Sequence, residues 1–243
     1  MTSDVPASAL QVGGLVAFSA TDFPGRLSAV VFVQGCPWRC HYCHNPHLQT
    51  RCEAGALDWQ NLRSWLARRV GLLDAVVFSG GEPCMDPALP QAMCDVRAMG
   101  FAVGLHTAGI YPRRLGEVLP WVDWVGLDIK AAPERYASIT QVSGSGAPAW
   151  ECANAVLASG VEHEFRTTIH PDLHSEDDVR DLGLRLQGMG VRHYAVQEFR
   201  PTGCNDMALA TPVGHAGPLI SAALQTELAA CFDTFTYRSA STH

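Results

Sequence analysis

The chain has 243 residues, of which 47% are hydrophobic and 17% are charged, which is enough for one well-cored domain. A net charge of −7 gives no basic surface for nucleic acid, and no stretch approaches the roughly 18 unbroken apolar residues of a membrane span. Residues 1–20 lack the apolar run of a signal peptide. Nine cysteines, an odd number, argue against a disulfide framework, so we expect a cytoplasmic protein with metal-bound or buried thiols and with neither nucleic-acid nor membrane partners.

Apolar, β-branched runs alternate with segments of helical spacing along the chain. The predicted strands are Ala29–Gln34, Ala75–Ser79, Phe101–His106, Val122–Asp128, Glu164–Ile169 and His193–Phe199. The predicted helices between them are Leu57–Val70, Pro87–Met99, Pro112–Leu119, Trp150–Ser159 and Ser175–Gly188. Strands that alternate with helices form a parallel sheet through right-handed crossovers. The sequence therefore predicts an α/β fold, either an open doubly wound sheet or a partial barrel.

Three further segments complete the predicted organisation. The stretch Val142–Ala149 is rich in glycine and serine and is predicted to be a flexible loop before a helix. Residues 205–218 contain many Pro, Gly and Thr and are also predicted to be a loop. A closing helix (Leu219–Cys231) and a short strand (Thr234–Arg238) follow. We expect one domain over residues 1–243.

Polar and glycine-rich stretches follow the predicted strands, where folds of this class carry their chemistry. A loop with three cysteines follows the first strand. The other strands end in SGGEP (Ser79–Pro83), LHTAG (Leu105–Gly109), LDIK (Leu127–Lys130), RTTIHP (Arg166–Pro171) and QEFRPTGC (Gln197–Cys204). Because parallel strands end at the same edge of a sheet, these stretches are expected to meet there.

The cysteines Cys36, Cys40 and Cys43 have the spacing C-x3-C-x2-C. A structural zinc site needs four ligands, and the chain has no second C-x2-C pair, although His44 or His47 could supply the fourth ligand. An ordinary [4Fe–4S] electron carrier also needs four cysteines. Three thiolates on such a cluster leave one iron open to bind a substrate, which is the favoured interpretation, while zinc stays an alternative.

Two motifs together resemble a known family. The three cysteines with Tyr42 read C-x3-C-x-aromatic-C, and Gly80-Gly81-Glu82 follows the second strand, as in radical S-adenosylmethionine (SAM) enzymes. Thr21–Pro46 is similar to the activating enzymes of glycyl radical enzymes, in particular to the anaerobic ribonucleoside-triphosphate reductase activating proteins. The likeness extends from about Val12 to Cys204. It implies a radical SAM core with a partial (β/α)6 TIM-type barrel over about residues 12–204 and a C-terminal tail over residues 205–243.

The resemblance also implies a role for each candidate residue. Cys36, Cys40 and Cys43 would hold one [4Fe–4S] cluster, and SAM would chelate its fourth iron. The implied SAM contacts are Tyr42 at the adenine, Gly80 and Gly81 along the methionine, Glu82 at the ammonium, Asp128 and Lys130 near the carboxylate, Arg166 as a second anion partner, and Arg200 toward the ribose, with His44 and Thr107 also at the SAM site. No catalytic residue is implied beyond the cluster and SAM site. Lys130 has independent support, because it is the only lysine among 17 basic residues and suggests a need for a compact ammonium.

The implied activity is that of an anaerobic radical SAM oxidoreductase. It would cleave SAM reductively at the cluster, and a 5′-deoxyadenosyl radical would abstract hydrogen from a glycine of a partner glycyl radical enzyme. The resemblance implies that this partner is an anaerobic ribonucleoside-triphosphate reductase. A low-potential donor such as flavodoxin or ferredoxin would supply the electron. Two alternatives stay open: a radical SAM enzyme acting on a small molecule, similar to 7-carboxy-7-deazaguanine synthase, and a non-catalytic zinc-binding module.

Overall fold

A computed structural model describes residues 5–51, 57–210 and 217–240. Its centre is one eight-stranded sheet in the order β1 to β8. The strands are β1 (Val12–Ser19), β2 (Ser28–Val33), β3 (Ala75–Gly80), β4 (Ala102–Thr107), β5 (Trp124–Asp128), β6 (Glu162–Ile169), β7 (His193–Glu198) and β8 (Thr234–Arg238). Neighbours pair in parallel from β2 to β8, whereas β1 runs antiparallel to β2. Among the described strands β1 and β8 do not pair with each other, so the sheet stays open between them.

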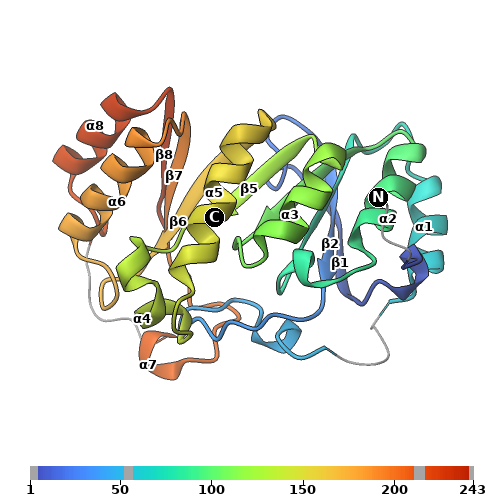
Figure 1. Cartoon of the computed structure of the whole chain (residues 1–243), viewed down its shortest axis with the longest axis horizontal. Helices are drawn as coiled ribbons and strands as arrows, with labels where there is room; N and C mark the ends of the chain where they lie inside the picture. The colour runs from blue at the N-terminus through green and yellow to red at the C-terminus, as the bar shows by residue number, and fades with distance from the viewer. Residues whose placement is uncertain (1–4, 52–56, 211–216, 241–243) are drawn as a thin grey trace.

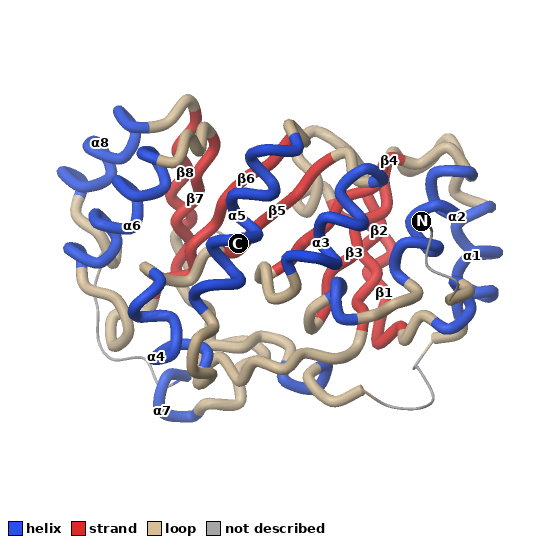
Figure 2. The backbone as a smooth tube through the Cα atoms, viewed as in Figure 1, coloured by secondary structure: helices blue, strands red, loops and turns tan. Residues whose placement is uncertain are grey.

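The helices cover one face of this sheet. They are α1 (Trp59–Ala67), α2 (Leu89–Ala98), α3 (Pro112–Val118), α4 (Tyr136–Thr140), α5 (Gly146–Ser159), α6 (Glu176–Gly188), α7 (Met207–Ala210) and α8 (Ala222–Cys231). In Figure 1 α3 and α5 lie in front of the strands, α6 and α8 lie to the left, α1 and α2 lie to the right, and α4 and α7 lie at the lower edge. Figure 2 shows the same arrangement, with long loops along that lower edge and further loops at the upper edge. None of the described helices is both long and apolar enough to span a membrane.

Two apolar clusters lie on the two faces of the sheet, because successive strand side chains point to opposite sides. The larger cluster fills the space between sheet and helices and includes Phe78, Leu105 and Phe165, all fully buried. The smaller one lies on the other face, around Val77 and Trp124. It fills the interior of the barrel next to the strand ends, so the polar residues at those ends rest on a packed apolar layer.

The observed strands agree with the predicted ones, whose ends differ by at most two residues. β1 was not predicted, since Gly13 and Gly14 interrupt its apolar pattern. The predicted strand Thr234–Arg238 is β8, and it brings the parallel strands to seven. These residues therefore extend the same sheet as the expected core.

Two predicted loops contain helical residues. α5 begins at Gly146, inside the stretch predicted to be flexible, because Gly146 packs against Pro133 so closely that a Cβ would lie 2.3 Å from the Pro133 carbonyl oxygen. The hydroxyls of Thr140 and Ser145 bond at 2.7 Å and fix the turn before it. The second loop contains the short helix α7, while residues 211–216 and 241–243 of the predicted tail lie outside the described residues.

Candidate functional site

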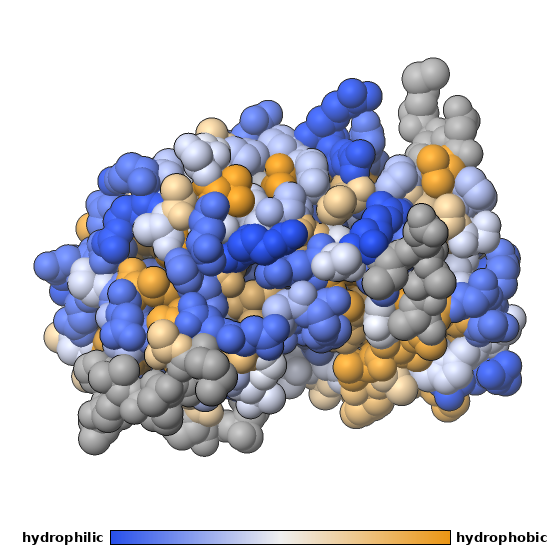
Figure 3. Space-filling model, turned by 90° about the horizontal axis from the view of Figure 1, so that it is seen from below, coloured by the Kyte–Doolittle hydropathy of each residue, from blue (hydrophilic) through white to orange (hydrophobic). Residues whose placement is uncertain are grey.

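A cavity of about 330 Å³ opens at the carboxyl ends of the parallel strands. Figure 3 looks onto this edge of the molecule and shows hydrophilic residues over most of its centre. The cavity is lined by every predicted site residue except Glu82 and Arg200, namely Cys36, Cys40, Tyr42, Cys43, His44, Gly80, Gly81, Thr107, Asp128, Lys130 and Arg166. Stretches far apart in the sequence thus meet in one site, as their positions after the strands predict.

The cysteine loop is fastened on both sides by backbone hydrogen bonds. Cys36 donates its N–H to the Gln49 carbonyl at 3.1 Å, and Arg39 donates to the Thr140 carbonyl at 3.0 Å. Trp38 and Tyr42 are buried and anchor the loop in the core, while the thiols face the cavity. The alternation of aromatic anchors with cysteines therefore holds the three thiols at the cavity wall.

The surroundings of the cysteines disfavour deprotonation of the free thiols. Burial, with the nearby Glu82, raises the pKa of Cys36 to about 12, and burial also raises the pKa of Cys40. Iron would stabilise the thiolates and displace their protons on binding. No three His, Cys, Asp or Glu side chains of the described chain converge closely enough to hold a single metal ion. Three thiolates that each bind a different iron of a cluster do not need to converge in this way.

Gly80 and Gly81 are required by the protein's own backbone. Gly80 has φ of +130°, and a Cβ there would lie 2.3 Å from the Val33 carbonyl oxygen of β2. A Cβ on Gly81 would lie 2.5 Å from the Gly35 carbonyl oxygen. The turn after β3 can therefore press against the start of the cysteine loop only if both residues are glycine. Both also line the cavity, where their predicted contact with SAM remains open.

Glu82 lies behind the cavity wall and organises it. Its carboxylate accepts hydrogen bonds from the Thr107 hydroxyl at 2.7 Å and from the amides of Cys84 and Ala108, both at 3.0 Å. Burial raises its pKa, while these hydrogen bonds oppose that rise. Glu82 thus fixes Thr107 at the end of β4. Its predicted contact with the SAM ammonium stays a prediction.

Asp128, Lys130 and Arg166 form a charged group on the cavity wall. The Arg166 Nε lies 3.1 Å from the Asp128 carboxylate, and Gly126 leaves room for the guanidinium, since a Cβ there would lie 2.6 Å from it. Burial opposes ionisation of Asp128, but Arg166 and Lys130 outweigh it and lower its pKa. Two cations and one carboxylate leave one positive charge in excess, which fits an anionic group of a ligand.

The Lys130 ammonium completes this group. Lys130 is only 8% exposed, and its ammonium lies 5.4 Å from the centre of the Tyr42 ring. Burial lowers its pKa, but the charges of Tyr42, Cys40 and Asp128 outweigh this and raise it. No described residue accepts a hydrogen bond from the ammonium, and the Tyr42 hydroxyl is buried without a partner. The Lys130 ammonium and the Tyr42 hydroxyl are therefore both free to hydrogen-bond a ligand in the cavity.

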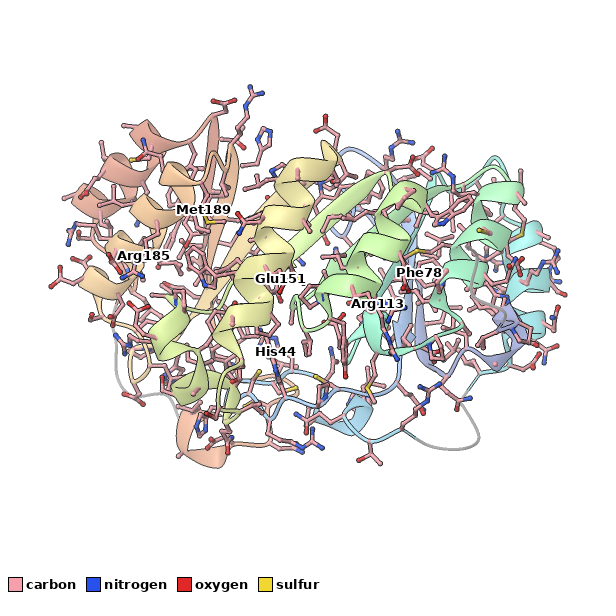
Figure 4. The ribbon with its side chains drawn as sticks, in the orientation of Figure 1. His44, Phe78, Arg113, Glu151, Arg185 and Met189 are labelled. Atoms are coloured by element: carbon pink, nitrogen blue, oxygen red, sulfur yellow. The ribbon has the colours of Figure 1, made fainter. Side chains whose placement is uncertain are left out.

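His44 and Arg200 lie together beside the cavity mouth. The His44 ring stacks on Phe199 with 5.5 Å between ring centres, and its Nε2 donates to the Arg200 carbonyl at 2.9 Å. Figure 4 shows His44 at the lower edge of the sheet, near sulfur atoms of the cysteine loop. Arg200 thus positions His44 through its backbone, whereas its predicted place toward the ribose remains a prediction.

Asp22 and His106 are among the cavity residues that sequence reasoning missed. His106 donates from Nε2 to the Asp22 carbonyl at 2.8 Å and packs edge-on against Trp124. Burial and the charge of Arg166 lower the pKa of His106 to about 4, so it is neutral at pH 7. The alternation of side chains along β4 was the available signal, because it places His106 on the same face of the sheet as Asp128 and Arg166.

The site fits an iron–sulfur cluster and SAM on its own chemistry, because three thiols, the two cations Lys130 and Arg166, and an unpartnered buried hydroxyl surround one cavity. A family model described as the radical SAM superfamily matches residues 30–183, and the chain belongs to this superfamily. Its members bind a [4Fe–4S] cluster and SAM. The chain is thus a radical SAM enzyme.

Two relatives cover most of the chain. A protein of Methanocaldococcus jannaschii described as a glycyl-radical enzyme activating enzyme is 28% identical over 207 residues, which are 80% of this chain and 82% of the relative. The pyruvate formate-lyase-activating enzyme of Clostridium pasteurianum is 32% identical over 183 residues, which are 71% of this chain and 74% of the relative. The predicted resemblance to radical SAM activating enzymes is confirmed at this level.

A solved structure confirms the fold class. The crystal structure of Streptococcus suis SuiB bound to the precursor peptide SuiA matches with a TM-score of 0.63 at 11% identity, over 86% of this chain and 48% of SuiB. The chain therefore spans about half the length of SuiB. The fold that they share is the partial TIM barrel of radical SAM proteins.

Proposed function

We propose that this chain is a glycyl radical enzyme activating enzyme, with an anaerobic ribonucleoside-triphosphate reductase as its partner. The observation that carries the proposal is the cavity in which three cysteine thiols face the Asp128, Lys130 and Arg166 group. The names of the two relatives and the likeness over Thr21–Pro46 support a protein substrate. The gap between β1 and β8 supports it too, because an open barrel can admit a peptide loop.

The proposed mechanism assigns most residues to binding and shielding. Cys36, Cys40 and Cys43 would hold the cluster, and Lys130 with Arg166 would bind the carboxylate of SAM. When bound, the cluster and SAM supply a one-electron cleavage that yields a hydrogen-abstracting radical. The apolar cluster around Val77 and Trp124 closes the barrel below the site, so that water and side reactions are excluded.

A glycine is a suitable hydrogen donor because it has no side chain to keep its Cα–H away from the reacting carbon. The test is to mix the reduced protein, SAM and the candidate reductase without oxygen and to record the electron paramagnetic resonance spectrum. We expect a protein radical doublet that disappears when the glycine of the partner is changed to alanine. Cleavage of SAM with consumption of a small molecule, and no protein radical, would support the small-molecule alternative instead.

A further inference from the structure

His163 has a buried ring nitrogen that no described residue satisfies. It lies near the start of β6, and its Nδ1 is 2.8 Å from the Val161 carbonyl oxygen. Because a carbonyl oxygen can only accept, Nδ1 carries the proton, and the neutral ring keeps a lone pair on Nε2. This Nε2 is buried and has no hydrogen-bond partner in the described chain. A buried acceptor left without a partner costs free energy, so its presence requires an explanation.

A second histidine ring lies against the first. His193 is the first residue of β7, and the centre of its ring is 6.3 Å from that of His163, with an angle of 68° between the two planes. The Nδ1 of His193 is 2.7 Å from the hydroxyl of Thr234 on β8. When this hydroxyl accepts the Nδ1 proton, the Nε2 of His193 also carries a free lone pair.

The two rings have the arrangement of histidines that share a metal ion. A histidine that binds a metal through one ring nitrogen donates from the other nitrogen to a fixed oxygen, as His163 does to the Val161 carbonyl. At a metal–nitrogen distance of roughly 2.0–2.1 Å, two imidazoles on one ion have ring centres roughly 5–6.5 Å apart. The observed separation of 6.3 Å lies within this range.

The charges beside the pair favour a cation. Glu162 directly precedes His163, is exposed, and forms no ion pair within the described chain. The other charged side chains next to the two histidines in the sequence or in the sheet are paired with each other, namely Arg192 with Asp233 and Glu164 with Arg238. Glu162 therefore leaves one negative charge that no neighbour neutralises.

We propose that His163 and His193 form a binding site for one divalent transition-metal ion of the Ni²⁺ or Zn²⁺ type. Imidazole nitrogen suits these ions. No three His, Cys, Asp or Glu side chains converge anywhere in the described chain, so the protein supplies two ligands and water completes the coordination. The ion would tie β6 to β7 at their amino ends, opposite the cavity, and the site is independent of the proposed function.

The first test measures nickel binding by equilibrium dialysis of the untagged, cluster-loaded holoenzyme without oxygen. We expect His163→Phe and His193→Phe each to weaken binding at least about tenfold, while phenylalanine keeps an aromatic ring in place. His170→Gln is the control and should bind normally, because its Nδ1 accepts from the Asp172 amide at 3.1 Å and its Nε2 lies 3.3 Å from the Leu209 carbonyl oxygen. Iron analysis after dialysis checks that nickel has not displaced the cluster.

The second test leaves both proposed ligands in place. Thr234→Val removes the hydroxyl that orients His193, and we expect it to weaken nickel binding about tenfold. Thr236→Val is its matched control, since Thr236 is an exposed threonine of the same strand that pairs with Ala195. Nickel should also raise the melting temperature of the wild type and not that of His163→Phe. Equal nickel affinity in the wild type and His163→Phe, or in Thr234→Val and Thr236→Val, would overturn the proposal. Neither test uses SAM or a partner protein, so their outcome does not depend on the proposed function.

Discussion

At the scale of single residues, the site depends on a few side chains whose chemistry no neighbouring residue could supply. Lys130 is the only lysine, and it is buried with its ammonium facing the cavity. An arginine there would need more room and would present a planar fork instead of a compact charge. The residue that composition singled out thus has an ammonium that finds no hydrogen-bond acceptor among the described residues of the site.

We predict that Lys130→Ala weakens SAM binding and leaves the cluster assembled. A charge-assisted hydrogen bond to a carboxylate contributes roughly 1.5–3 kcal/mol, which corresponds to about a tenfold to hundredfold loss of affinity. Equilibrium dialysis of the reconstituted protein measures the affinity, and iron analysis checks the cluster. Unchanged affinity would mean that Lys130 does not contact SAM.

We predict that Gly80→Ala strongly destabilises the protein. The φ of +130° and a Cβ only 2.3 Å from the Val33 carbonyl oxygen force the backbone of β2 or β3 to move. We expect a loss on the order of 3 kcal/mol in the free energy of unfolding, measured by chemical denaturation. Gly116→Ala is the control, because nothing lies within 4 Å of that Cβ and alanine favours a helix; equal effects of the two would contradict the argument.

His106 predicts a pH dependence of stability. The folded pKa is about 4, lowered by burial and by Arg166 against the opposing charges of Asp22 and Asp128. The unfolded pKa is about 6.5, so between these values only the unfolded state binds the proton, and stability falls as the pH falls. The loss reaches about 3 kcal/mol near pH 4. Denaturation of wild type and His106→Asn at pH 7 and pH 5 measures it, and the wild type should lose more.

At the scale of elements, the short helix α4 holds the cysteine loop in place. Its carbonyls at Ile139 and Thr140 accept the amides of His41 and Arg39, and the Gln141 side chain donates to the Arg39 carbonyl at 2.6 Å. Gln141 ends the helix with φ of 59°, the only non-glycine with positive φ among the described residues. A left-handed glutamine costs free energy, and the bond to the loop offsets part of it.

We predict that Gln141→Gly leaves overall stability nearly unchanged and speeds the release of iron to a chelator. Glycine relieves the left-handed backbone, but the hydrogen bond to the cysteine loop is lost. The rate is followed by the colour of the iron chelate under anaerobic conditions. Ser138→Ala is the control, because the Ser138 hydroxyl donates to the Arg135 carbonyl within its own turn. Equal rates in both variants would show that the Gln141 bond does not hold the loop.

At the scale of the whole molecule, the candidate site lies at one edge of the sheet, and the helix-covered face makes the fold rigid. The carboxyl ends of β2 to β7 surround the cavity, while the helices on the outer face bury the large apolar core. β8 and α8 continue this arrangement beyond the expected core. The cavity is therefore a property of the assembled barrel and of no single element.

We predict a single oxygen-labile [4Fe–4S] cluster per chain. The chain has three closely spaced cysteines on the cavity and no second C-x2-C pair in its sequence. Anaerobic analysis should give about four irons and four sulfides per chain. A stoichiometric zinc content, or nearly eight irons, would contradict the prediction, and a Cys40→Ala variant should lose the iron.

The sequence by itself determined the cysteine spacing, the GGE turn and the alternation of strands with helices. These features are carried by residues close together in the chain, so local periodicity and spacing are enough to predict a parallel α/β sheet, either open or rolled into a partial barrel, with three thiols on one loop. The choice of the partial barrel came from the resemblance to radical SAM enzymes. The sequence also placed the polar stretches after the strands, because parallel strands end at one edge.

Only the tertiary structure decided which side chains meet. Asp128 pairs with Arg166, which lies 38 residues away, and Glu82 bonds Thr107, which lies 25 residues away. These contacts depend on the register between strands, which a single sequence does not reveal, since one shift of register turns every side chain to the opposite face. The requirement for glycine at position 80 also comes from the tertiary structure, because the atom that excludes a Cβ belongs to Val33 on the neighbouring strand.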